Sequence, residues 1–345
     1  MIIRSRAPLR LGLAGGGTDV SPYSDQFGGA ILNATINKFA YVTLLPLDIP
    51  QIVIKCHDIN EHHIFNDIDQ FNLGDGKLNL IKGIHNRIIE EFNIKKPLFY
   101  QLETYVDAPP GSGLGSSSTL VVAIIAAFVE WLGLPLGDYD IAHLAYSIER
   151  EDLALSGGKQ DQYAATFGGF NFMEFYAEGR VVVNPLRVKR DYINELEFSL
   201  LQYYTGTSRL SSKIIDAQVR NVNAKAEKSI EAMHSLKKLA YDMKESLLRG
   251  NLANIGNLLH EGWQSKKEMA EEISNPLVDE IYETAIKHGA LGGKISGAGG
   301  GGYMMFYVKN GYLYHVINVL NKYEGKVERV NFYDNGVITW KAKNL

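Results

Sequence analysis

The stretch Pro109-Pro110-Gly111-Ser112-Gly113-Leu114-Gly115-Ser116-Ser117-Ser118 decides how the rest of this sequence is interpreted. It follows an alternating segment, residues 99–106, that is typical of a strand. It opens an apolar segment, residues 119–134, that predicts a buried helix. Its three glycines let backbone N–H groups approach an anion closely, and the helix N-terminus adds unpaired donors and a favourable dipole. Residues 109–118 therefore predict a phosphate-binding loop.

The loop differs from two better-known phosphate motifs. It lacks the Gly-Lys-Ser/Thr ending of a Walker A loop, and its glycine spacing is not that of a dinucleotide-binding fold. The serine hydroxyls can cap the helix, contact phosphate oxygens or bind Mg²⁺. The alternative to phosphate binding is a purely structural role, as a flexible loop followed by an N-cap. The expected phosphate contacts are Pro110, Gly111, Gly113, Leu114, Gly115, Ser116, Ser117 and Ser118.

Two further glycine-rich segments lie near the two ends of the chain. Residues 6–19 form an apolar strand that contains Arg10 and ends in Gly15-Gly16-Gly17-Thr18-Asp19. An arginine in such a strand must be paired or must face a polar site. Residues 294–302 hold a glycine run denser than a hairpin needs, which indicates close approach to a ligand or to another loop.

Composition restricts the class of protein. The chain has 345 residues, 46% hydrophobic and 21% charged, with a net charge of −4. This balance is ordinary for a soluble enzyme and unlike that of a nucleic-acid binder. Cys56 is the single cysteine, so no internal disulfide is possible. The N-terminus lacks a signal-peptide pattern, and Glu130 interrupts the most apolar segment. We expect a cytoplasmic protein with neither nucleic-acid nor membrane partners.

The pattern along the chain predicts two domains. Helices are expected over residues 78–92, 138–155 and 223–249, and another begins at Asn275-Pro276. The residue pattern changes after Pro185, from one typical of strands to a more polar one typical of helices. The predicted domains are residues 1–190, with the phosphate loop 109–118, and residues 191–345, with the Gly-rich loop 296–302.

The three glycine segments, in this order and spacing, resemble the GHMP kinase superfamily, named for galactokinase, homoserine kinase, mevalonate kinase and phosphomevalonate kinase. The resemblance spans nearly the whole chain. It implies an α+β fold of two domains, an N-terminal domain like ribosomal protein S5 domain 2 and a ferredoxin-like C-terminal domain. It also implies an active site in the cleft between them and the use of ATP and Mg²⁺.

Within the superfamily, residues 7–10 and 14–19 look like the D-glycero-D-manno-heptose 7-phosphate kinases. The implied reaction is phosphorylation of the anomeric hydroxyl of this sugar phosphate to the 1,7-bisphosphate, in the synthesis of nucleotide-activated heptose. The alternatives are a fucokinase- or galactokinase-like kinase of a free sugar, a lyase like diphosphomevalonate decarboxylase, and a non-catalytic sensor. Galactokinases carry Gly-Glu-His-Thr-Asp where this chain has residues 15–19, which counts against galactose.

The resemblance also assigns expected roles to single residues. Asp161 is the expected general base, and Arg10 is the cation beside it. Glu149, twelve residues before Asp161, and Ser117 are the expected Mg²⁺ ligands. Gly297 and Gly299 are expected to approach the nucleotide from the second domain. The expected substrate contacts are Gly17, Thr18, Asp19, Lys159 and Arg209, with Lys213 as a further candidate for a distal phosphate. The oligomeric state, monomer or homodimer, stays open.

Overall fold

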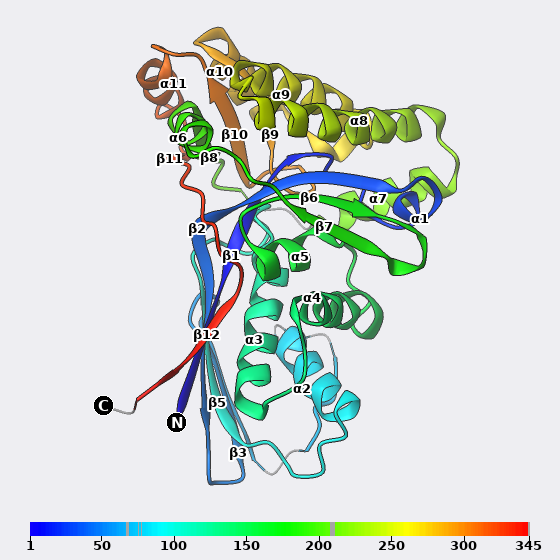
Figure 1. Cartoon of the computed structure of the whole chain (residues 1–345), viewed down its shortest axis with the longest axis vertical. Helices are drawn as coiled ribbons and strands as arrows, with labels where there is room; N and C mark the ends of the chain where they lie inside the picture. Colours follow the sequence, from blue (N-terminus) through cyan, green and yellow to red (C-terminus); the bar gives the residue numbers. More distant parts are fainter. Residues whose placement is uncertain (67–68, 75, 77, 208–210, 344–345) are drawn as a thin grey trace.

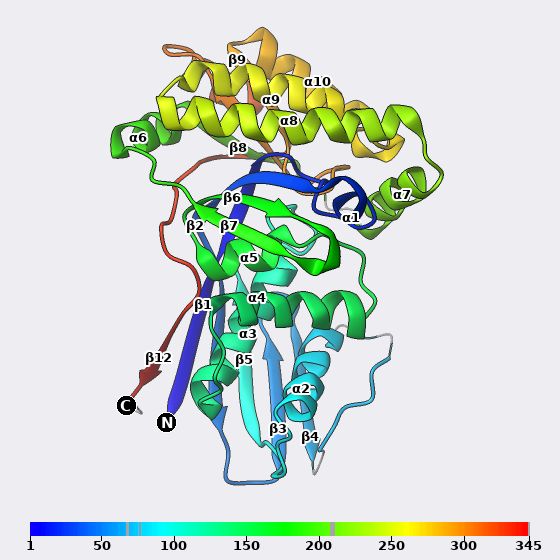
Figure 2. The same ribbon diagram turned by 45° about the vertical axis from the view of Figure 1, so that its right-hand side comes forward.

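The computed structural model describes residues 1–66, 69–74, 76, 78–207 and 211–343. It has two layered parts, each a sheet covered by helices (Figure 1). The two chain ends lie together at the end of the molecule opposite the paired helices α8 (Glu227–Arg249) and α9 (Leu252–Lys267), as both views show (Figures 1 and 2).

The larger sheet has the strand order β12-β1-β2-β5-β3-β4, and β6 pairs with both β2 and β7. Only the β3–β5 pair is parallel among the pairs of the described residues. The strands of the larger sheet are β1 (Ile2–Ala14), β2 (Gly29–Pro46), β3 (Gln51–Cys56), β4 (Glu61–Asn66), β5 (Tyr100–Val106), β6 (Phe170–Phe175), β7 (Val181–Pro185) and β12 (Ile338–Ala342).

Strand β1 carries the first predicted site residue. Its pairing with β2 shifts register between Pro8 and Arg10 and again between Gly12 and Ala14. Such irregularities bend a strand and re-aim its side chains. They flank Arg10, whose guanidinium is almost fully buried.

Helices α2 to α5 lie on one side of the larger sheet, where α3 and α5 contact β1 and β2 (Figure 2). Helix α3, the apolar segment after the phosphate loop, is buried on nearly all sides, as expected for a helix without a polar face. Within the described residues, no helix is both long and apolar enough to cross a membrane. The helices are α1 (Tyr23–Phe27), α2 (Asn79–Glu91), α3 (Ser116–Leu132), α4 (Asp138–Ser147) and α5 (Gln160–Phe167).

The helix predicted over residues 138–155 is shorter than expected. Helix α4 ends at Ser147 and continues as a π-helical turn, η1 (Ile148–Asp152), which carries Glu149. The chain then leaves the helix, and Ala154 has a φ of 51°. Single π-turns are rare and are frequently found at functional sites, and helical periodicity alone does not reveal them.

The smaller sheet is antiparallel, with the order β11-β8-β10-β9. The chain runs strand, helices, two strands, helix, strand, which is the ferredoxin-like arrangement and confirms the predicted fold. Its strands are β8 (Leu200–Tyr204), β9 (Ala290–Ile295), β10 (Tyr303–Val308) and β11 (Lys326–Arg329), and its further helical segments are α7 (Ser211–Asn223), α10 (Pro276–Lys287) and α11 (Leu313–Leu320). The remaining short elements are α6 (Arg190–Ser199) and the 3-10 turns η2 (Ala177–Gly179) and η3 (Glu271–Ile273).

Two local predictions for the second half have clear outcomes. The Asn275 side chain accepts a hydrogen bond from the Val278 N–H at 3.1 Å, which confirms the predicted cap of α10. Strand β12 returns to the larger sheet and pairs with β1, Ile2 opposite Ala342. The domain boundary near residue 190 stays a prediction, and the last strand joins the sheet of the first half.

Candidate active site

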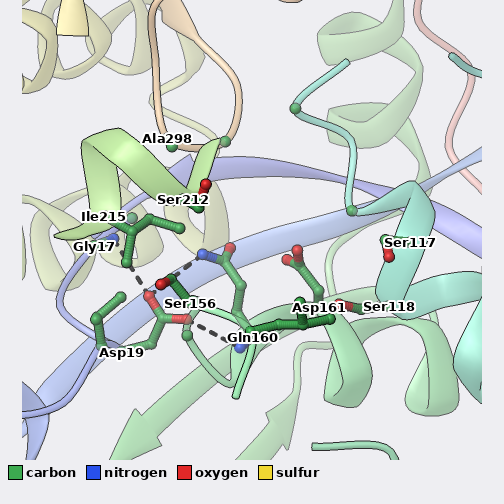
Figure 3. Close-up of a pocket in the computed structure, with 18 of the residues that line it drawn as sticks. Gly17, Asp19, Ser117, Ser118, Ser156, Gln160, Asp161, Ser212, Ile215 and Ala298 are labelled. Atoms are coloured by element: carbon green, nitrogen blue, oxygen red, sulfur yellow. Dashed lines mark hydrogen bonds between the residues drawn. The ribbon is translucent and has the colours of Figure 1, made fainter. Parts of the chain in front are cut away.

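A cavity of about 360 Å³ opens between the two halves of the molecule (Figure 3). The phosphate loop, the turn after β1 and the segment from η1 to α5 surround it on one side. Helices α7 and α9 and the loop after β9 surround it on the other. The predicted residues that line it are Arg10, Gly17, Asp19, Gly111, Gly113, Gly115, Ser116, Ser117, Ser118, Glu149, Asp161 and Gly297.

The glycines of the phosphate loop are needed for both conformation and space. Gly113 and Gly115 have φ values of 84° and 76°, in the left-handed region. A Cβ atom added to Gly113 would lie 2.3 Å from the Ser296 carbonyl oxygen. One added to Gly115, the N-cap of α3, would lie 3.1 Å from the Asp161 carboxylate. The loop therefore lets backbone reach both the other half of the molecule and the expected base.

The two Gly-rich loops hold each other. The Ser296 hydroxyl donates to the Gly113 carbonyl at 2.9 Å, and the Tyr303 N–H donates to the Ser112 carbonyl at 2.9 Å. A Cβ atom on Gly297 would lie 2.7 Å from the Gly113 Cα atom. Of the two reasons proposed for the dense glycine run, close approach to another loop is therefore observed.

Arg10 and Asp161 form the central ion pair of the cavity. Asp161 Oδ1 accepts from Arg10 Nε at 2.7 Å and lies 2.6 Å from Nη2. Arg10 Nη1 donates to the Gly113 carbonyl at 2.6 Å, which ties the pair to the phosphate loop. No described residue donates to Asp161 Oδ2. The carboxylate points into the space between Gln160 and Ser117 (Figure 3).

Asp19 organises the opposite wall. Its Oδ2 accepts from the backbone N–H groups of Lys159 and Gln160 at 2.9 and 3.0 Å, so it holds the segment that leads into α5. A Cβ atom on Gly158 would lie 1.9 Å from this oxygen, so the residue there must be glycine. Burial raises the pKa of Asp19, and the nearby Asp161 charge adds to this effect, while the Gln160 N–H opposes it.

Glu149 projects from the π-turn η1 toward the first turn of α3. Its side chain is 2% exposed. Its carboxylate accepts from the Ser118 hydroxyl at 3.0 Å and from the Gln162 amide at 2.5 Å. Burial raises the pKa of this carboxyl, and the Arg150 charge and the two hydrogen bonds partly offset the rise. A buried carboxylate beside serine hydroxyls is the oxygen donor set that Mg²⁺ prefers.

Several predicted residues lie outside the cavity wall. Pro110 flanks the wall, Leu114 is fully buried, and Gly299 packs against Ile273, so none of these side chains or positions lines the cavity. The Thr18 hydroxyl is buried and donates to the Gly15 carbonyl at 2.8 Å, which shapes the turn.

Two of the predicted basic residues, Lys159 and Lys213, do not bring their charges to the cavity. The Lys159 ammonium lies 3.8 Å from an Asp25 carboxylate oxygen and 5.5 Å from the ring centre of Tyr146, and only its backbone N–H serves the site. Lys213 is exposed and does not line the cavity. Arg209 lies outside the described residues.

The cavity includes residues that sequence reasoning did not select, chiefly Lys266 of α9, Gln160 and Arg150. Lys266 is almost fully buried, and its ammonium donates to the Gly297 carbonyl. Burial, with the Arg10 charge, lowers the pKa of Lys266 to about 7, and Asp19 acts in the opposite direction. Gln160 Oε1 is buried without a hydrogen-bond partner among the described residues. Gln160 adjoins Asp161 in sequence, which was the only available signal.

These groups define a class of chemistry. A loop of backbone donors and a helix N-terminus can hold phosphates. A carboxylate fixed on one oxygen by arginine keeps the other oxygen available for a hydroxyl proton. A cation and oxygen ligands can offset the charge of a phosphoryl group. The arrangement is that of a phosphotransferase acting on an alcohol.

Comparisons with known proteins agree with this class. The family model described as GHMP kinases N terminal domain matches residues 79–169, and the model described as GHMP kinases C terminal matches residues 243–323. The chain is 48% identical over 339 residues to "D-glycero-alpha-D-manno-heptose 7-phosphate kinase" of Campylobacter jejuni, covering 98% of this chain and 99% of that protein. The chain belongs to the GHMP kinases, which are ATP-dependent phosphotransferases.

Two other relatives extend the comparison. A crystal structure of a "D-glycero-D-manno-heptose 1-phosphate kinase" from Bacteroides thetaiotaomicron superposes with a TM-score of 0.84 at 45% identity, covering 99% of this chain and 100% of that one. A Bacteroides fragilis protein named "L-fucokinase/L-fucose-1-P guanylyltransferase" is 27% identical over 333 residues, which are 90% of this chain and 35% of that protein.

Proposed function

We propose that this kinase phosphorylates the anomeric hydroxyl of D-glycero-D-manno-heptose 7-phosphate, with ATP as donor, to give the 1,7-bisphosphate. The full-length relative at 48% identity is named for this substrate, which supports the choice of acceptor. The observation that carries the reaction type is the Arg10–Asp161 pair, with a free carboxylate oxygen facing the phosphate loop.

Asp161 is the proposed general base. Because Arg10 holds Oδ1 with two nitrogens, Oδ2 is the oxygen that can accept the proton of the sugar hydroxyl. The acceptor oxygen then bonds to the γ-phosphorus as the bond to the bridging oxygen of ADP breaks. Arg10 holds the carboxylate in its orientation, and it links the base to the loop that holds the donor.

Glu149 and Ser117 are the proposed Mg²⁺ ligands. Both line the cavity, and Ser118 and Gln162 hold the Glu149 carboxylate in place. Within the described residues, no group of three or more His, Cys, Asp or Glu side chains could hold a metal. Mg²⁺ suits this sparse protein set because phosphate oxygens and water complete its coordination. When bound, the ion would neutralise charge on the donor phosphates.

Gly17, Asp19 and Gln160 are the proposed acceptor side of the site. Asp19 Oδ2 already accepts hydrogen bonds from two backbone N–H groups, so its main contribution is to position residues 157–160. The unpartnered Gln160 Oε1 can accept a hydrogen bond from a sugar hydroxyl. Thr18 and Lys159 support this wall through their turn and backbone contacts. Because ATP is supplied in the cytoplasm, we also place the reaction there.

A panel of acceptors tests the proposal. The protein is incubated with ATP, Mg²⁺ and, separately, heptose 7-phosphate, heptose 1-phosphate, fucose, galactose and diphosphomevalonate, and the products are followed by phosphorus NMR. We expect a new anomeric phosphate only with heptose 7-phosphate. Transfer to fucose or galactose without reaction on heptose 7-phosphate would reject the acceptor, and ATP-dependent release of CO₂ from diphosphomevalonate would favour the lyase.

A further inference from the structure

Lys266 is a buried cation at the edge of the cavity that the mechanism above does not use. It lies in the last turn of α9 and is 3% exposed. An ammonium has three donors, yet among the described residues this one has a single acceptor, the Gly297 carbonyl. No carboxylate among the described residues forms an ion pair with it. A buried charge without a counter-ion is costly, so an anion from outside the chain is the natural partner.

The charges around Lys266 make the deficit of anions clear. Arg10 faces it from β1, Asp19 faces it from the turn after β1, and Lys294 lies near it on β9. Asp19 is already engaged by backbone N–H groups, and Arg10 is engaged by Asp161. Burial and the Arg10 charge lower the pKa of Lys266 to about 7. An anion that enters the cavity would restore the charged form.

Lys294 shows what a purely structural lysine looks like in the same region. It is also buried, and its ammonium donates to the Gly12 carbonyl at 2.8 Å. Burial, with the Lys266 and Arg10 charges, lowers its pKa well below the usual value. It does not line the cavity, whereas Lys266 does. Access to the cavity therefore separates the two lysines.

The position of Lys266 indicates which anion it meets. Its acceptor, Gly297, packs against Gly113 of the phosphate loop. The other carbonyl at this contact, that of Gly113, accepts from Arg10. Arg10 and Lys266 thus donate to neighbouring carbonyls, those of Gly113 and Gly297, at the place where the phosphate loop lies next to Asp161. In the proposed mechanism the phosphoryl group passes between the phosphate loop and Asp161, which is where these two cations lie.

We propose that Lys266 binds the oxygens of the phosphoryl group while it passes from ATP to the acceptor, so that the C-terminal half supplies a catalytic cation. This inference rests on the proposed phosphotransfer and adds a residue to it. The lysine stays protonated throughout: the acceptor oxygen–phosphorus bond forms, the bond to the ADP oxygen breaks, and the acceptor proton goes to Asp161. A cation fixed at developing charge lowers the barrier without reorganisation.

Three variants test this assignment: Lys266→Met, Lys266→Arg and, as a control on the same helix, Lys267→Met, whose parent ammonium is partly exposed and 3.9 Å from Asp279. We expect Lys266→Met to lower kcat about 100- to 1,000-fold. The KM of the acceptor and the Kd of a non-hydrolysable ATP analogue should change less than about threefold. Lys267→Met should match the parent.

The pH dependence of kcat/KM distinguishes a catalytic role of Lys266 from a purely structural one. Because Lys266 in the ligand-free protein loses its charge as pH rises through about 7, kcat/KM of the parent should fall above that pH. Lys266→Arg should keep part of its activity and lose this descending limb, since guanidinium stays charged. Unfolding curves confirm that each variant is folded.

Each other outcome overturns the assignment. A raised acceptor KM with unchanged kcat would place Lys266 on a distal phosphate of the acceptor, and unchanged kinetics would make it structural. The series uses whichever acceptor the parent phosphorylates, or its ATP hydrolysis to water if it phosphorylates none. An error in the proposed acceptor therefore leaves this test intact.

Discussion

The substitution Gly113→Ala tests whether the two Gly-rich loops form one structural unit. Gly113 has a φ of 84°, and a Cβ atom there would lie 2.3 Å from the Ser296 carbonyl oxygen and 3.0 Å from its carbonyl carbon. Both atoms belong to backbone, so the clash cannot be relieved by turning a side chain. The loop after β9 must move away from the phosphate loop by about 1 Å to reach ordinary contact distance.

Gly133 offers a matched control. It ends α3 in the same left-handed region, with a φ of 64°, and an added Cβ atom would have no neighbour within 4 Å. Gly133→Ala therefore carries the conformational strain alone, roughly 1–2 kcal/mol. Gly113→Ala adds the separation of the loops, which weakens the Ser296–Gly113 and Tyr303–Ser112 hydrogen bonds. Each is worth about 1 kcal/mol, so we expect a total loss of roughly 3–4 kcal/mol.

Urea unfolding of the parent and both variants measures the difference, and calorimetric titration with a non-hydrolysable ATP analogue measures the site. Gly113→Ala should lose more stability than Gly133→Ala and should bind the analogue at least about tenfold more weakly. Equal losses of stability in the two variants, with unchanged analogue affinity in both, would refute the argument that the loops position each other.

Three further predictions concern charged groups. Asp161→Asn should keep the affinity for the ATP analogue but lower the rate of ADP release about 100- to 10,000-fold, and an unchanged rate would contradict the role of base. Glu149→Gln should raise the Mg²⁺ concentration needed for half-maximal rate, measured by metal titration. If the substitution removes only the charge of the ligand, the rate at saturating Mn²⁺ should change little. An unchanged Mg²⁺ requirement would exclude Glu149 as a ligand. Lys266→Met should stabilise the ligand-free protein at pH 6. The folded pKa of Lys266 is about 7 against 10.5 for the free amine, so its burial opposes folding fully below pH 7 and not at all above about 10.5. That shift corresponds to at most about 5 kcal/mol, and urea unfolding at pH 6 and pH 9 should show the advantage shrinking as pH rises.

The sequence was informative where the required backbone conformation is local. Glycines at 111, 113 and 115 predicted a loop with left-handed residues before a helix, and all three have positive φ. The cap at Asn275 was recognised for the same reason, because the acceptor and the donor are three residues apart. The family resemblance supplied the ferredoxin-like arrangement, which depends on contacts that no local pattern encodes.

Contacts between distant segments were beyond such reasoning. Lys266 is a lysine in the last turn of a helix, where a solvated position that complements the helix dipole is the usual interpretation. Only the packing of α9 against β9 buries it beside the cavity. Lys159 illustrates the same difficulty. The sequence made it a candidate for contacting a distal phosphate of the sugar, whereas its ammonium lies beside Asp25 and Tyr146.

The electrostatics of the cavity connect these residues to the binding of ligands. Burial raises the pKa of Asp19 and of Glu149 and lowers that of Lys266, so each group in the ligand-free protein is disfavoured in its charged form. A phosphoryl group beside Lys266 and a divalent cation beside Glu149 would each reverse the local penalty. Because the chain bears these penalties before ligands arrive, part of the binding free energy restores charge to the site. Because the Kd of the ATP analogue is expected to change less than about threefold in Lys266→Met, this variant should gain nearly the same stability from bound analogue as the parent, within about 0.7 kcal/mol.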